Sequence, residues 1–222
     1  LDDAENNNLA RSYQGKTVTD LDTLPLPARH LLKDNQGGNI FAYNKQYLDT
    51  DSTVIIATRG CPFSCAFCTA PALTNNRMRF RDPKLVAAEV HHVVEKYGIR
   101  QFRFSDDMFT ANKQHVLELS KELEKENVIW RISCRVKPLD DDMLQAMWDG
   151  GCRELSFGIE SFDDAVLTGL QKRATAKDNV DACERAAKYG YKTRVLFMIR
   201  TPFQTPKTIE LKKHYIQQIP FD

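Results

Sequence analysis

Short apolar runs alternate with stretches of helical periodicity from residue 51 onward, and the alternation repeats five times. Runs rich in β-branched and aromatic residues predict strands at residues 53–58, 101–105, 128–136, 153–159 and 192–199. Each run is followed by apolar positions three and four residues apart, which predict helices beginning near residues 82, 112, 140, 178 and 206. Repeated strand-helix units of this kind predict an α/β fold with a parallel sheet.

Capping residues mark the ends of several predicted helices. Asp82 precedes Pro83, which suits the first turn of a helix, and Gly98 follows the last apolar position of that helix. Asp140 is the expected N-cap of a later helix that ends at Gly150. These signals place the loops that join strands to helices within one or two residues.

Right-handed crossovers between successive parallel strands curl such a series into a barrel or part of one. The functional site is then expected at the carboxyl ends of the strands, because the loops there meet at one rim. The rule predicts that a cysteine-rich loop after residue 58 shares this rim with Asp106, Asp107, Arg135, Glu160 and the turn at 199–205.

The first 50 residues lack the alternation and are predicted to form an irregular connector, with the core domain at residues 51–222. Residues 11–19 predict a small hairpin. Two prolines within residues 20–32 exclude a regular helix there and favour an extended path before a turn at residues 28–32. Because the chain begins at Leu1 and stops just after a helical pattern, we expect both ends to be cut from a longer protein.

The balance of charged residues bears on which partners the protein can attract. Lys and Arg number 31 and Asp and Glu number 30, so net charge gives no general attraction to nucleic acid or to an anionic membrane. The chain has no apolar run of about 18 residues and no signal-peptide pattern, so we expect a cytoplasmic protein without a membrane span. In that compartment Cys134, Cys152 and Cys183 are expected to be free, buried cysteines.

The other three cysteines lie within eight residues, in the segment Arg-Gly-Cys-Pro-Phe-Ser-Cys-Ala-Phe-Cys-Thr-Ala-Pro. Cys61, Cys65 and Cys68 have the spacing C-x-x-x-C-x-x-C, and three thiolates on a short loop can converge on one iron-sulfur cluster. A cubane cluster has four irons, so three cysteines leave one iron open to a substrate or cofactor.

Two other interpretations of these cysteines stay open from the residues alone. Cys65 and Cys68 form a C-x-x-C pair that could be redox-active, although this leaves Cys61 unexplained. A structural zinc site would need a fourth ligand from elsewhere. The candidate histidines are His30, His91, His92, His115 and His214, none of them in a paired ligand spacing.

The cysteine segment resembles the motif of the radical S-adenosylmethionine (radical SAM) superfamily, in which an aromatic residue, here Phe67, usually precedes the last cysteine. The resemblance implies a six-unit TIM-like (β/α)6 barrel, present here with five units, and a [4Fe-4S] cluster whose free iron binds SAM. It also implies reductive cleavage of SAM to a 5'-deoxyadenosyl radical. The sixth strand would begin near Phe221 and is expected to be missing.

Residues after three other strands match family motifs. Asp106 and Asp107 take the place of the motif that contacts the SAM amino group, in the form typical of the cobalamin-binding branch. Glu160 lies in a Gly-Ile-Glu-Ser motif whose carboxylate is near SAM in related enzymes; the alternative is a surface ion pair. Arg135 could pair with the SAM carboxylate or form a structural salt bridge with the adjacent rim acids. Arg200 and Phe203 depart from the family, which has glycine at those positions of the turn.

Residues 20–29 resemble the connector that follows the cobalamin domain in this branch, so the resemblance implies cobalamin-dependent methylation of an unactivated carbon. A cyclase, or a cobalamin-independent enzyme such as a methylthiotransferase, is the alternative, and a zinc-stabilised binding module is a more distant one. The expected partners are a small-molecule substrate and an electron donor such as flavodoxin or ferredoxin. Cobalamin is expected in the longer protein and not on this chain alone, because 19 residues before the connector cannot form a corrinoid-binding domain.

Overall fold

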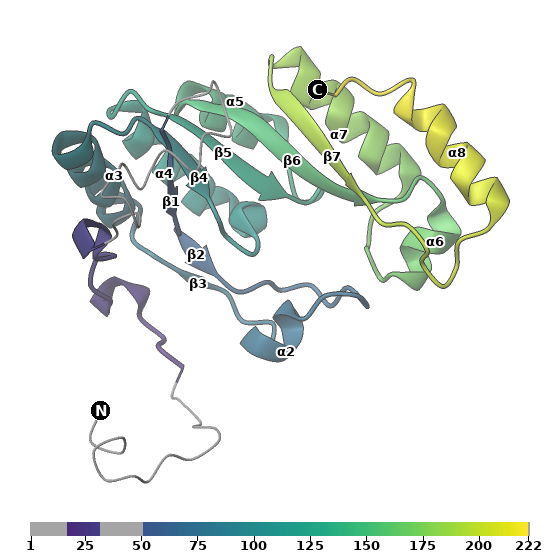
Figure 1. The fold of residues 1–222 in the computed structure, drawn as a ribbon, viewed down its shortest axis with the longest axis horizontal. Helices are drawn as coiled ribbons and strands as arrows, with labels where there is room; N and C mark the ends of the chain where they lie inside the picture. The colour runs from purple at the N-terminus through teal and green to yellow at the C-terminus, as the bar shows by residue number, and fades with distance from the viewer. Residues whose placement is uncertain (1–16, 32–50, 222) are drawn as a thin grey trace, which may run out of the picture.

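A curved parallel sheet forms the centre of the computed structural model, which describes residues 17–31 and 51–221. Its strands are ordered β1-β4-β5-β6-β7, so strands that follow one another along the chain are neighbours in this sheet (Figure 1). The bounds are Thr53–Ile55 for β1, Gln101–Phe104 for β4, Ile129–Cys134 for β5, Cys152–Glu160 for β6 and Lys192–Phe197 for β7. The α/β fold with five parallel strand-helix units is confirmed.

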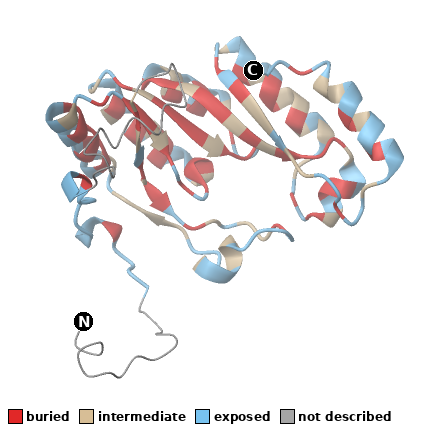
Figure 2. Ribbon diagram, viewed as in Figure 1, coloured by how far each residue is buried: buried red, intermediate tan, exposed pale blue. Residues whose placement is uncertain are grey.

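The connecting helices cover one face of this sheet. They are α3 (Pro83–Tyr97), α4 (Lys113–Glu124), α5 (Asp141–Asp149), α7 (Ala176–Lys188) and α8 (Pro206–Ile216). Side chains from α3, α4, α5 and α7 pack with alternate side chains of the strands in one hydrophobic core. Figure 2 shows this core as a continuous buried band along the strands and the inner sides of the helices.

Aromatic side chains fill the centre of the core. Phe104, Phe109 and Trp130 pack with ring centroids 5.2 to 5.5 Å apart, and all three are at most 1% exposed. Each such side chain contributes roughly 1.5–3 kcal/mol of stability by leaving water. The opposite face of the sheet, which points away from these helices, carries mostly polar side chains, among them Arg103, Arg131, Ser133 and Ser156.

Helix capping follows the sequence closely. The Asp82 side chain accepts a hydrogen bond from the Lys84 amide, and Gly98 ends α3 at a φ of 68°. Asn112 and Asp140 cap α4 and α5 in the same way. The predicted starts of these helices are therefore confirmed.

The first predicted strand is wrong in its extent. β1 ends at Ile55, and the chain then leaves the sheet as β2 (Thr58–Arg59), which pairs antiparallel with β3 (Arg79–Phe80). The amides of Ala57 and Thr58 donate hydrogen bonds to the Asp106 carboxylate, so they are not available to the backbone of a neighbouring strand. The resulting β2–β3 hairpin carries the cysteine loop, residues 60–78, away from the sheet (Figure 1).

Two further predictions need correction. The segment after β6, where no helix was predicted before residue 178, contains the helix α6 (Asp164–Gly169), capped by the Asp163 side chain. The next helix starts at Ala176, because Thr175 and Asp178 form a capping box. A short helix α2 (Ala70–Thr74) also lies within the cysteine loop.

The connector is packed against the core. A short 3-10 turn at Leu21–Thr23 (η1) interrupts the expected extended path, whereas the 3-10 turn Arg29–Leu31 (η2) lies where a turn was predicted at residues 28–32. A further 3-10 turn, η4 (Phe109–Ala111), follows β4. Arg29 is buried and bonds to Glu89 of α3 at 2.7 Å. Most of the hairpin predicted at residues 11–19 lies outside the described residues. Within the described ranges, none of the helices is long and apolar enough to cross a membrane.

Candidate functional site

The cysteine loop begins where the β2–β3 hairpin opens. Gly60, with a φ of 99°, makes the turn into it, and a Cβ there would lie 2.0 Å from the Arg77 carbonyl oxygen. Cys61 is partly buried, Cys65 is buried and Cys68 is exposed. Only glycine fits this entrance, because both the backbone angle and the available space exclude a side chain.

A cation and an amide already lie beside two of the three sulfurs. Arg135, which follows β5, donates a hydrogen bond to the Cys65 Sγ at 3.0 Å, and its guanidinium lies 4.0 Å from the centre of the Phe63 ring. The Ala70 amide lies 3.4 Å from the Cys68 Sγ. Burial raises the pKa of the Cys61 thiol, while the Phe63 amide and the Arg135 charge lower it.

These contacts suit thiolate ligands. A cation and backbone N–H groups directed at sulfur favour the deprotonated form that binds iron, and such hydrogen bonds are typical of iron-sulfur sites. Within residues 17–31 and 51–221, no three Cys, His, Asp or Glu side chains are gathered as a formed metal cage. The structure thus does not bring the sulfurs of Cys61, Cys65 and Cys68 together into one cage. The loop nevertheless supplies the thiol donors and N–H groups that suit an iron-sulfur cluster.

The two aspartates after β4 hold the approach to the loop. Asp106 Oδ1 accepts the amides of Ala57, at 3.0 Å, and Thr58, and Asp107 Oδ2 accepts the Gly60 amide at 2.9 Å. Burial raises the pKa of Asp106 to about 7, against the lowering effect of these hydrogen bonds. Both carboxylates thus fix the backbone that leads to Cys61.

Glu160 ends β6 beside the loop. Its Oε1 accepts a hydrogen bond from Lys172 Nζ at 2.9 Å, and the side chains of Glu160 and Lys172 are 11% and 5% exposed. Its φ of 65° is unusual for a residue with a side chain. Gly158 leaves room for the pair, because a Cβ there would lie 2.9 Å from Glu160 Oε1 and 3.0 Å from Lys172 Nζ. The ion pair that could have been a surface feature is buried.

Lys172 was missed by the sequence analysis. Its ammonium lies 5.9 Å from the centre of the Phe67 ring, and the Leu170 carbonyl oxygen accepts the Ala66 amide at 3.0 Å. The segment after α6 therefore contacts the cysteine loop directly. No sequence signal indicates this, because Lys172 follows an unpredicted helix and belongs to no motif.

The turn after β7 has a left-handed backbone conformation at Arg200, a residue that is not glycine. Arg200 has a φ of 60°, and its amide bonds to Gln204 Oε1 at 2.6 Å. Phe203 packs against α6, where a Cβ on Gly169 would lie 2.3 Å from its ring. The turn thus contacts the same α6 segment that precedes Lys172.

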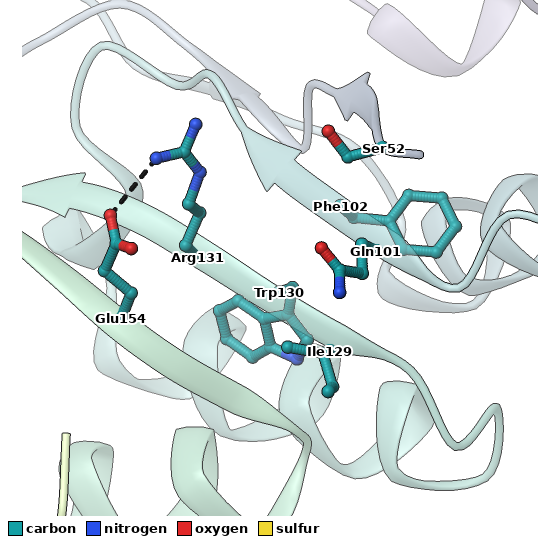
Figure 3. Close-up of a pocket in the computed structure, with 7 residues that line it drawn as sticks. All are labelled: Ser52, Gln101, Phe102, Ile129, Trp130, Arg131 and Glu154. Carbon is teal, nitrogen blue, oxygen red and sulfur yellow. Dashed lines mark hydrogen bonds and ion pairs between the residues drawn. The ribbon is translucent and has the colours of Figure 1, made fainter. Parts of the chain in front are cut away.

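A separate pocket lies at the opposite, amino-terminal end of the strands. Figure 3 shows the residues that line it, among them Ser52, Gln101 and Trp130. Arg131 and Glu154 also line this pocket and form an ion pair at 3.1 Å. None of the predicted rim residues lines this pocket.

Comparison with known proteins places the cysteine loop in context. The family model described as the Radical SAM superfamily matches residues 55–213. An uncharacterized methyltransferase of Pyrococcus horikoshii is 28% identical over 98% of this chain and 46% of that protein. The anaerobic magnesium-protoporphyrin IX monomethyl ester cyclase of Rubrivivax gelatinosus is 29% identical over 68% of this chain and 28% of that protein. The chain thus spans less than half the length of these relatives.

Solved structures share the fold. The radical S-adenosylmethionine methyltransferase TsrM from Kitasatospora setae has a TM-score of 0.70 at 20% identity, covering 75% of this chain and 33% of that one. The cobalamin-dependent S-adenosylmethionine radical enzyme OxsB has a TM-score of 0.66 at 15% identity, covering 78% of this chain and 28% of that one. At these identities the likeness shows a common architecture.

Proposed function

Because the chain belongs to the radical SAM superfamily of enzymes, we propose that Cys61, Cys65 and Cys68 bind a [4Fe-4S] cluster and that S-adenosylmethionine binds its open iron. The contact between Arg135 and the Cys65 sulfur carries this proposal, because it directs a buried cation at one of the three thiols. When bound and reduced, the cluster supplies the electron that cleaves SAM to methionine and a 5'-deoxyadenosyl radical.

The residues around the loop are assigned to positioning and binding. Asp106 and Asp107 position the loop through the amides of Ala57, Thr58 and Gly60. Arg135 holds its guanidinium against the Cys65 sulfur. We assign Glu160 to a polar group of SAM and Phe67 to covering it. Asp106 is thereby given a positioning role in place of the direct SAM contact that the motif implied.

For the reaction of the whole protein we propose methyl transfer to an unactivated carbon with a cobalamin as proximal methyl donor, held outside these 222 residues. The names of the relatives support methyl transfer, and the structural neighbours include a cobalamin-dependent enzyme. Radical cyclisation is the second candidate, since two relatives are cyclases. Residues 51–222 would form the catalytic core and residues 1–50 its connector, in the cytoplasm with a flavodoxin or ferredoxin as electron donor.

Anaerobic reconstitution with iron and sulfide tests the cluster. We expect about four irons and four sulfides per chain, and release of 5'-deoxyadenosine when the reduced protein meets SAM. Cys65→Ala should lose the cluster absorbance and the paramagnetic signal. Cys183→Ser is the matched control, because this buried cysteine lies in α7, and its iron content should equal that of the wild type. A full cluster in Cys65→Ala would refute the ligand assignment.

A further inference from the structure

The face of the sheet that points away from the connecting helices carries three arginines, Arg103, Arg131 and Arg194. Phe102 and Phe104 of β4 point into the helix-covered core, so by alternation Arg103 points to the opposite face. Arg131 of β5 lies beside Arg103 in register, and Glu154 of β6 lies beside Arg131. Arg194 of β7 lies on the same face and bonds to Glu154 at 3.2 Å.

Glu154 pairs with two of these three guanidinium groups. Glu154, 1% exposed, pairs with Arg131 at 3.1 Å and with Arg194 at 3.2 Å, as Figure 3 shows for the first pair. Arg103 has no ion pair or hydrogen bond within the described part of the chain. Like charges on adjacent strands destabilise a sheet, so the arrangement favours an added negative charge.

The arginines line a pocket that also offers hydroxyl donors. Its cavity volume is about 160 Å³, and its lining includes Arg103, Arg131, Arg194, Ser133, Ser156 and Leu196. Among the described residues, neither serine hydroxyl has a hydrogen-bond partner. Guanidinium groups and hydroxyls that converge in a partly enclosed space are the donors that bind carboxylate and phosphate oxyanions.

The pocket lies one strand layer below the rim. Ser133 and Ser156 are paired in register, and Arg135 and Gly158 follow them two residues later at the rim. Val54 and Leu196, which are 38% and 50% exposed, stand on this face on opposite sides of the arginines. A ligand held by its oxyanion in this pocket would therefore reach the rim with an apolar part.

We propose that the substrate is an anionic small molecule whose carboxylate or phosphate binds to Arg103, with Arg194, Ser133 and Ser156 as further donors. This rests on the proposed function, in which the reacting carbon lies at the rim beside the cluster. Arg131 is held by Glu154 and supplies positive potential behind the site.

Titration calorimetry on the reconstituted chain tests the subsite with two probes, succinate for carboxylates and inorganic pyrophosphate for phosphates. We expect one of the two to bind at one site, and Arg103→Gln to weaken that binding roughly 10-fold to 100-fold. Lys121→Gln, which removes an exposed positive charge from the outer side of α4, is the matched control and should bind the probe like the wild type.

The outcomes separate the two proposals. Release of 5'-deoxyadenosine by wild-type protein that binds neither probe would overturn the subsite and leave the proposed function standing. Specific binding of a probe by wild-type protein that releases no 5'-deoxyadenosine would overturn the proposed function and leave the subsite standing. Equal affinity in Arg103→Gln and Lys121→Gln would also overturn the subsite, because the attraction would then be general.

Discussion

At the scale of single residues, Asp106 combines two roles that oppose each other. Its carboxylate organises the amides before the cysteine loop, yet it is 9% exposed and its Oδ2 has no hydrogen-bond partner among the described residues. Burial raises its pKa from 3.8 to about 7. The ionised form thus costs folding free energy that the neutral form does not.

A pH dependence of stability follows from Asp106. The folded carboxyl loses its proton near pH 7 and the unfolded one near pH 3.8, so the native state binds more protons between these values. Stability should fall as pH rises through this window, with a contribution of up to about 1.4 kcal/mol per pH unit, and level off above it. Denaturant unfolding of wild type and Asp106→Asn from pH 4 to 8 measures the slope.

In Asp106→Asn this contribution should vanish, since the amide oxygen can still accept the two backbone N–H groups but does not ionise. Asp107→Asn is the control and should keep the wild-type slope, because Asp106 remains. Parallel profiles for wild type and Asp106→Asn would contradict the buried titration.

Glu160 and Lys172 form a second coupled unit at residue scale. Removing one partner of a buried ion pair leaves an uncompensated charge, so Lys172→Met should cost about 3–5 kcal/mol. The double variant Glu160→Gln/Lys172→Met should be closer to wild type, because neither charge is then left alone. Urea unfolding of both variants measures the difference, and equal losses would show that the pair is solvated.

Binding of SAM gives Glu160 a separate test. Losing one hydrogen bond to a polar ligand group costs about 1.5–3 kcal/mol, so Glu160→Ala should weaken SAM binding roughly 10-fold to 100-fold. Equilibrium dialysis of the reconstituted protein gives the dissociation constant. Glu160→Ala also breaks the ion pair with Lys172, so Lys172→Met is the control. If the two variants lost equal SAM affinity, the loss would come from the broken ion pair and not from a contact between Glu160 and SAM.

At the scale of elements, the β2–β3 hairpin decides where the cysteine loop projects. Its entrance depends on Gly60, where a Cβ would meet the Arg77 carbonyl oxygen at 2.0 Å. Gly60→Ala should therefore displace the loop and lower the bound iron by roughly half or more, because the new side chain strains the turn and has no space. Gly98→Ala is the control, since its φ is also positive at 68° but no atom lies within 4 Å of its Cβ.

Gly98→Ala should cost about 1 kcal/mol of stability and leave the iron content unchanged. Iron analysis after reconstitution compares the two variants directly. Equal iron in both would mean that the loop tolerates a shift of its entrance.

At the scale of the whole molecule, the connector is tied to the core by a buried charge network. Arg29 bonds to Glu89 at 2.7 Å and to the Val54 carbonyl at 2.9 Å, and Arg81 bonds to Glu89 at 2.6 Å. The network joins residues before the sheet to β1 and α3. It fixes the connector next to the strand that leads to the cysteine loop.

Arg29→Met should destabilise the protein by about 1–3 kcal/mol, because Val54 loses a donor while Arg81 still neutralises Glu89. His30→Ala, at the exposed neighbouring position, should change stability by less than about 0.5 kcal/mol. Chemical unfolding followed by circular dichroism measures both. A loss below that of His30→Ala would mean that the connector is not part of the folded unit.

The sequence by itself determined the strand-helix order, the caps at Asp82 and Asp140 and the helix start near Asn112. It also predicted one rim for the cysteine loop, Arg135 and Glu160. These follow from local periodicity, from capping chemistry and from the rule that parallel strands end together, none of which needs side-chain coordinates. The cluster ligands are likewise predicted from the spacing of Cys61, Cys65 and Cys68 within a short segment.

Only the tertiary structure decided which of these residues meet. Asp106 ends β1 early by bonding to Ala57, 49 positions before it, and Arg103 lies beside Arg131, 28 positions after it. Lys172 pairs with Glu160 because a helix that periodicity missed lies between them. Such contacts are set by strand register and by packing across the sheet, which act between segments distant in the chain. Local pattern therefore predicts the elements, and the packed fold selects the partners of each charge.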